Sequence, residues 1–215
     1  MRQLSASPSA GYFFPIFAFL AVEGYFHTRS FKRYALRMLL FAVLSEVPFD
    51  LMYGGTVFYP VHQNVIWTLL LGLLGIRLME AARAKGKRWL YILTCAAVVV
   101  LGFALGTLGM VDYYGAGVLT VFAFYFFRER KWWCLLGQLA ALYWLNVAVL
   151  GGQMYPVTLF GREIELCEQG LALLALVPIW LYRGRQGHHS KAFQYACYAF
   201  YPAHMLVLAL LTMIQ

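Results

Sequence analysis

The sequence predicts an all-α, polytopic integral membrane protein of about eight transmembrane helices, which form one helical-bundle domain over residues 1–215. Three observations lead to this prediction. The chain is 62% hydrophobic and only 12% charged, which is about half the charge of an ordinary soluble domain. It divides into eight apolar runs, and its basic residues gather in alternate loops between those runs. Lipid must therefore solvate most of the protein surface.

The eight apolar runs are interpreted as helices because most reach the roughly 17–25 residues that span a bilayer. The first and fifth runs are short, so these two helices are expected to be tilted, to thin the bilayer or to be partly re-entrant. The runs cover approximately residues 11–26, 34–53, 64–82, 89–111, 114–127, 132–150, 166–182 and 192–214.

The charged loops predict the direction of each helix. Fifteen of the 17 Lys and Arg residues lie in or beside the loops that follow the first, third, fifth and seventh runs. The positive-inside rule places these loops in the cytoplasm and both ends of the chain outside. The net charge of +8 is thereby explained by topology, so no nucleic-acid partner is expected. The same cations could also bind an anionic cytoplasmic ligand.

Motifs of soluble enzymes are absent from the sequence. The four cysteines lie far apart, without a CxxC pair or a Cys/His spacing that fits zinc, so no metal site is expected. The chain also has no P-loop, GxSxG, HExxH or dinucleotide-binding glycine motif. Any activity must therefore come from polar side chains on the helices and short loops.

Polar residues inside apolar runs are the candidates for function, because ionisable groups are costly in a membrane. A carboxylate beside a histidine suits proton transfer, since imidazole titrates near neutrality and the carboxylate stabilises its charged form. The same residues could instead be packing groups with satisfied hydrogen bonds. The six strongest candidates are Glu46, Asp50, His62, Asn64, Asp112 and His204. Other polar residues in or beside the runs are Glu23, His27, Gln138, Asn146 and Glu168.

The loop between the second and third runs predicts a contact between two of the candidates. It is short and contains Gly54, Gly55 and Pro60, which favour turns. The two helices are therefore expected to be antiparallel neighbours, with Asp50 orienting His62 as a general base. His204 is expected nearer the membrane midplane and is the alternative base.

Several stretches in this order resemble one known family. They are FPIFAFLAVEGYFHTR (14–29) continuing to SEVPFD (45–50), HQNV (62–65) with TLLLGLL (68–74), DYYG (112–115), and FYPAHML (200–206). Together they resemble the TraX family of membrane proteins, which is linked to N-acetylation of conjugative pilin. Family members usually begin with an extra helix carrying Asp-His-Ile-Gly and then a Gly-Arg. This sequence opens MRQLSASPSA and has neither feature. An added leading helix would make the N-terminus cytoplasmic.

The resemblance implies a multi-pass protein of the bacterial inner membrane that transfers an acetyl group from cytoplasmic acetyl-CoA. The acceptor would be an amine such as a pilin N-terminus, or an envelope carbohydrate hydroxyl, presented at the outer side. Arg29, Arg33 and Arg37 could hold the CoA phosphates. Asn64 could polarise the thioester carbonyl. The alternatives are a small transporter or flippase, and a non-catalytic membrane assembly factor.

Overall fold

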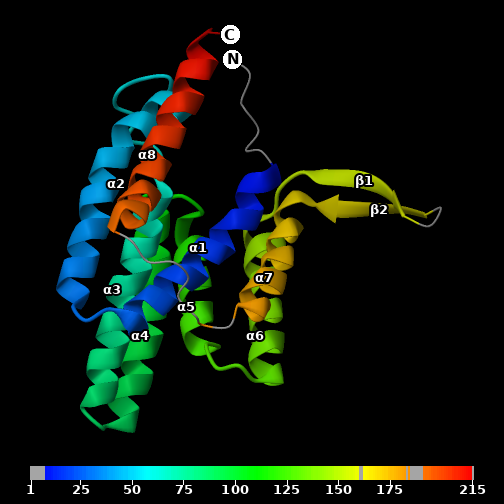
Figure 1. Ribbon diagram of the computed structural model, residues 1–215. Coiled ribbons are helices and arrows are strands. Elements are labelled where there is room, and N and C mark those ends of the chain that lie inside the picture. The colour runs from blue at the N-terminus through cyan, green and yellow to red at the C-terminus, as the bar shows by residue number, and fades with distance from the viewer. Residues whose placement is uncertain (1–7, 160–161, 183, 185–190, 215) are drawn as a thin grey trace. The chain divides into compact units, whose positions relative to one another are not determined.

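The computed structural model describes residues 8–159, 162–182, 184 and 191–214, and most of them are helical (Figure 1). The first five helices are α1 (Pro8–His27), α2 (Phe31–Gly54), α3 (Val65–Ala84), α4 (Arg88–Leu108) and α5 (Tyr114–Phe126). They are followed by α6 (Trp132–Tyr143), a π-helical segment (Trp144–Leu150), β1 (Met154–Leu159), β2 (Arg162–Cys167), a 3₁₀ segment (Glu168–Ala175), α7 (Leu176–Leu181) and α8 (Lys191–Ile214).

The predicted helical regions are confirmed, with a correction to the seventh. It begins at the end of β2, continues as the 3₁₀ segment and becomes α-helical only over α7. Gly170 and Pro178 lie in this region. Glycine weakens a helix through its backbone entropy, and proline removes a backbone donor, so a single regular α-helix is disfavoured here.

A β-hairpin interrupts the otherwise all-α structure. β1 and β2 pair antiparallel, from Met154 opposite Cys167 to Leu159 opposite Arg162. The sequence analysis expected only a loop in this region. Val157, Thr158 and Ile164 are β-branched, and such residues favour extended backbone.

Three helical segments are long and apolar enough to cross a membrane, judged by length and composition over the described residues. They are Val65–Ala84, Arg88–Leu108 and Trp132–Leu150. Shorter apolar helical segments cover Tyr114–Phe126, Glu168–Leu181 and Ala199–Leu211.

The chain divides into two compact units. Unit 1 comprises Met1–His27 and Leu119–Arg183, and unit 2 comprises Thr28–Val118 and Gly184–Gln215. In unit 1, α1 packs on the 3₁₀ segment and on α7. In unit 2, α2 packs against both α3 and α8, and α3 also packs against α4 (Figure 1).

The core of unit 2 is centred on α3. Leu73, Ile76 and Met79 of this helix are completely buried, and so is Thr68 nearer its start. Residues three or four apart lie on the same side of a helix. The side of α3 that carries these residues therefore faces the interior, from the beginning of the helix onward. Asn64, the N-cap of α3, is likewise completely buried.

Candidate functional site

Two loops of unit 2 are joined by backbone hydrogen bonds. The Gln63 N–H donates to the Met110 carbonyl oxygen at 2.9 Å, and the Asp112 N–H donates to the Gln63 carbonyl oxygen at 2.9 Å. The Thr68 hydroxyl adds a third link by donating to the Asp112 carbonyl oxygen at 2.6 Å. The loop before α3 and the loop before α5 are therefore held side by side.

This connection places His62 next to Asp112. Nε2 of His62 lies 3.4 Å from Oδ1 of Asp112, and His62 is only 8% exposed. A carboxylate at this position orients the imidazole ring. The pair can therefore accept a proton from a bound group and stabilise the resulting imidazolium.

Aromatic rings surround the His62 imidazole. Tyr53 and Phe49 of α2 stack on it with centroid distances of 4.8 and 5.7 Å, and Tyr114 meets it edge-on at 5.8 Å. These ring contacts restrict rotation of the His62 ring.

The loop that carries Asp112 has an unusual backbone. Met110, Tyr113 and Tyr114 all have positive φ values, of 49°, 61° and 49°. Residues with a Cβ rarely adopt this conformation, and such strain concentrates at functional sites. Burial, followed by the nearby Asp112 carboxylate, raises the pKa of the Tyr113 hydroxyl far above its usual range. Tyr113 therefore keeps its proton at physiological pH.

The Glu46 carboxylate accepts hydrogen bonds from two side chains. The Trp67 indole N–H donates to Oε2 of Glu46 at 2.9 Å, and the Asn64 amide donates to the same oxygen through a short hydrogen bond. Asn64 also donates to the Ala42 carbonyl oxygen at 2.8 Å and accepts from the Ile66 N–H at 3.1 Å. Both amide hydrogens of Asn64 are thus used. The hypothesis that Asn64 polarises a thioester carbonyl does not fit this arrangement, in which Asn64 positions Glu46 and caps α3.

Asp50 does not pair with His62, so the predicted contact between them is wrong. Oδ2 of Asp50 instead accepts the Tyr59 backbone N–H at 3.0 Å. The α2–α3 loop folds back over the end of α2, so the hydrogen bond to this carboxylate oxygen comes from the backbone of the loop. The carboxylate beside His62 comes from Asp112, which is distant in the sequence.

His204 lies outside this cluster. It is exposed on α8 and stacks on Phe200, with ring centroids 5.6 Å apart. The expected alternative base is therefore not part of the cluster that contains His62 and Asp112. A step of three residues rotates the side chain by about 60° from alignment, and α8 turns Tyr201, not His204, inward.

Several buried oxygen atoms near these residues lack partners. Among the described residues of unit 2, Ser45 Oγ, Glu46 Oε1, Asp50 Oδ1 and the Tyr201 hydroxyl oxygen are buried and make no hydrogen bond. All four belong to α2 or α8, which pack together. Buried polar groups in native proteins are usually paired, so each unpaired one calls for an explanation. A ligand with N–H or O–H donors would satisfy them.

The sequence analysis did not select Ser45, Trp67 or Tyr201 as site residues. A signal was present for the two aromatic residues, because a Trp or Tyr in the interior of an apolar run needs a partner for its polar atom. Ser45 carries no comparable signal, because a serine can bond to the backbone of its own helix.

The three arginines proposed to hold CoA lie at or near the start of α2. Arg29, Arg33 and Arg37 are exposed, and within the described ranges none forms an ion pair. From Arg37 to Phe49, which stacks on His62, the helix rises by about 18 Å. An anion held by these arginines would therefore be well separated from the His62–Asp112 pair.

Several polar residues in the described part of unit 1 are paired with one another or with the backbone. Arg128 donates to Glu23 at 2.8 Å and lies 3.9 Å from the centroid of the Phe26 ring. The Gln138 side chain donates to the Phe127 carbonyl oxygen and accepts from the Trp180 indole, both at 2.8 Å. The two contacts of Gln138 explain its burial without a ligand.

Comparison with known proteins identifies the family. A family model described as "TraX protein" matches residues 10–212. The chain belongs to the TraX family. Together with its apolar helices, this membership makes it a membrane protein. A probable fimbrial assembly protein, FimC of serogroup H1 from Dichelobacter nodosus, is 26% identical over 204 residues, which cover 90% of this chain and 77% of that protein. No solved structure matches the chain significantly.

In this TraX-family protein, two of the stretches that carried the resemblance form the candidate site together. His62–Val65 and Asp112–Gly115 meet through the loop contacts described above. The stretch around Ser45–Asp50 supplies Glu46 and most of the unpaired oxygens. The last stretch contributes Tyr201.

Proposed function

We propose that this protein is a multi-pass acetyltransferase of the bacterial inner membrane. It transfers an acetyl group from cytoplasmic acetyl-CoA to the amine of a pilin-like polypeptide or to a hydroxyl of an envelope carbohydrate. The observation that carries the proposal is the His62–Asp112 pair, with 3.4 Å between Nε2 and Oδ1, beside buried oxygens that have no partners.

The residues of unit 2 suit the proton transfers of such a reaction. Acetyl-CoA would supply the acyl group as a thioester. His62 takes the proton from the acceptor as the acceptor nitrogen or oxygen bonds to the acetyl carbon. Asp112 stabilises the imidazolium that forms. His62 then returns the proton to the sulfur that leaves when the carbon–sulfur bond breaks.

The arginines at the start of α2 suit the end of acetyl-CoA that carries the phosphate groups. Arg29, Arg33 and Arg37 can bind phosphate groups through several N–H donors each. Arg33 and Arg37 are four residues apart and so share one side of the helix. The thioester must then extend about 18 Å along α2 to come near His62.

The proposal includes eight membrane-crossing segments with the basic loops in the cytoplasm. Cysteine labels placed at 27–37, 83–88, 128–131 and 183–191 should react only from the cytoplasmic side. Labels near Gly54, Asp112 and Gly161 should react only from outside. A single reversed loop would contradict the number of crossings.

A link to pili supports a polypeptide acceptor. The FimC relative is described as a probable fimbrial assembly protein, and the resemblance of this chain is to a family linked to pilin acetylation. The same link is compatible with a non-catalytic assembly factor. Direct measurement of acetyl transfer separates these two functions.

The decisive experiment follows labelled acetyl groups by mass spectrometry. Proteoliposomes with the purified protein receive labelled acetyl-CoA on the cytoplasmic side, and a pilin-like peptide with a free N-terminus or an envelope carbohydrate on the other. Replacement of the base in His62→Gln should lower the rate on the order of 10²–10⁴-fold. His204→Gln is the matched control and should retain near-normal transfer, because His204 is exposed outside the cluster.

Three outcomes would contradict the acetyltransferase. Transfer that survives His62→Gln in folded protein would remove the proposed base. A folded wild-type protein without transfer, combined with solute movement, would identify a transporter. A pilus defect that appears on deletion but not with His62→Gln would identify an assembly factor.

A further inference from the structure

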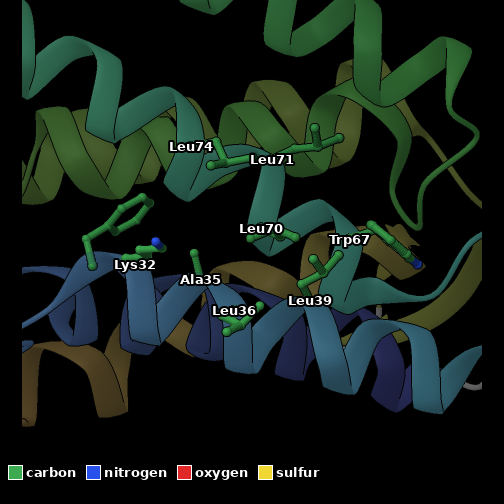
Figure 2. A pocket seen from close by; sticks show the side chains of 9 residues that line it. Lys32, Ala35, Leu36, Leu39, Trp67, Leu70, Leu71 and Leu74 are labelled. Carbon is green, nitrogen blue, oxygen red and sulfur yellow. The ribbon is translucent and has the colours of Figure 1, made fainter.

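A second feature of unit 2 lies between α2 and α3, toward the start of α2. The two helices leave a groove of about 520 Å³ between them (Figure 2). Its lining residues are Phe31, Lys32, Ala35, Leu36 and Leu39 from α2, and Trp67, Leu70, Leu71 and Leu74 from α3. Nearly all atoms that face the groove are carbon.

The two ends of the groove differ in chemistry. Lys32 stands at one end, and over the described ranges it has no ion-pair partner. The Arg77 guanidinium lies near the same end, 6.0 Å from the centroid of the Phe31 ring. Trp67 closes the other end, and its indole N–H is already donated to Glu46. The groove is therefore cationic at its mouth and offers no free donor at its inner end.

The groove is also open on one side. Leu36, Leu39 and Leu74 are 61%, 38% and 43% exposed, so it faces the surroundings of the helices and not a closed core. Along α2 it runs from Lys32 to Leu39, which is about 10 Å of helix rise. This length accommodates part of one hydrocarbon chain.

We propose that the groove binds one acyl chain of an anionic bilayer phospholipid, with the phosphate headgroup at Lys32 and Arg77. The carbon lining matches a hydrocarbon chain, which demands no hydrogen bonds. The cationic mouth attracts an anionic headgroup, as basic pockets between membrane helices do. The end of the chain contacts Trp67, so the bound lipid adjoins the residue that holds Glu46.

The same chemistry disfavours the arm of acetyl-CoA as occupant. That arm contains amide groups, and the groove has no free donor or acceptor along its length to pair with them. Burying an amide without a partner is unfavourable. The lipid site is therefore separate from the proposed acetyl transfer and does not depend on it.

The test measures lipid binding to the purified full-length protein by native mass spectrometry. Phosphatidylglycerol should bind more tightly than phosphatidylcholine with matching chains, by about fivefold for each basic residue near the headgroup. Lys32→Gln should reduce this preference by about fivefold and leave only the contribution of Arg77, whereas Lys87→Gln, at an exposed lysine outside the groove, should preserve it. Ala35→Phe should fill the groove and weaken binding of both lipids, whereas Ala97→Phe on the exposed surface of α4 should change neither.

Photochemical labelling locates the bound chain. Phosphatidylglycerol with a diazirine on one acyl chain should label the α2 and α3 residues of the groove in the wild type, and this labelling should fall in Ala35→Phe. Equal binding of the two lipids by the wild type would overturn the proposal. So would equal effects of Ala35→Phe and Ala97→Phe, displacement of the lipid by acetyl-CoA, or protection of the groove by a second copy of the chain.

Discussion

Buried polar side chains are mostly paired in unit 1, whereas several in unit 2 have an oxygen atom without a partner. In unit 1 the Gln138 amide makes one hydrogen bond through each end, and Asn146 donates to the Leu142 carbonyl oxygen at 2.9 Å. In the described part of unit 1, Gln169 Oε1 is the exception. The described residues of unit 2 include four such oxygens, on α2 and α8.

This difference indicates that polar side chains inside apolar helices have different roles in the two units. A side chain whose atoms are all paired within the protein contributes to packing and stability. A buried oxygen that lacks a donor destabilises the folded protein, because its hydrogen bonds to water are lost and not replaced. Substitutions in unit 1 are therefore expected to change stability, and those around His62 to change activity.

The largest expected effect on acetyl transfer concerns Asp112, which is compared with Glu23. Each of these two carboxylates contacts a basic side chain. Asp112→Asn in unit 2 keeps the shape of the side chain but removes the charge that stabilises the imidazolium. It should lower acetyl transfer on the order of 10²-fold or more, with little change in thermal unfolding. Glu23→Gln in unit 1 is the matched change and should leave transfer intact. Equal effects of the two substitutions on the transfer rate would remove the distinction.

A smaller effect concerns packing glycines in both units. A Cβ added at Gly117 would lie 2.7 Å from Thr68 Cγ2 and 2.9 Å from Tyr113 Cβ, while one at Gly137 would overlap the Phe127 ring. Gly117→Ala and Gly137→Ala should each lower stability by about 1–3 kcal/mol. Only Gly117→Ala should also lower the transfer rate per folded molecule, because it shifts the loop that carries Asp112. An unimpaired rate in Gly117→Ala would show that the loop position is not critical.

A comparable loss of stability, without loss of activity, is expected from Gln138→Leu. It leaves the Trp180 indole N–H and the Phe127 carbonyl oxygen without partners, at a cost of about 1–3 kcal/mol. The midpoint of thermal unfolding in detergent should fall, while transfer per folded molecule remains unchanged. An unaltered midpoint would mean that these hydrogen bonds contribute little to unit 1.

The smallest effect is expected at Ser45. Its side chain is completely buried, and its hydroxyl oxygen has no partner. Ser45→Ala removes a polar group that no hydrogen bond compensates, so stability should remain the same or rise by up to about 1 kcal/mol. Thermal unfolding measures this directly. A clear loss of stability would show that the hydroxyl is paired in the membrane, and the contrast with Gln138 would weaken.

Tertiary contacts decide which of the predicted site residues lie next to one another. His62 and Asp112 were both candidates because an ionisable group beside or inside an apolar run is conspicuous. Their pairing was not predicted, because the loop before α5 approaches the loop before α3 only after the helices have packed. His204 was equally conspicuous, yet the packing of α8 on α2 leaves it exposed and buries the Tyr201 hydroxyl.

The sequence by itself determined the helical regions, the polar residues to consider and the family resemblance. These follow from local properties, namely the length of apolar runs, the cost of charge in lipid and the order of short motifs. The tertiary structure alone decided that Asp112 and not Asp50 adjoins His62, and that Asn64 uses its amide on Glu46 and Ala42. It also decided which oxygens remain unpaired. Such contacts depend on how helices rotate and shift against one another, and distant side chains set that geometry together.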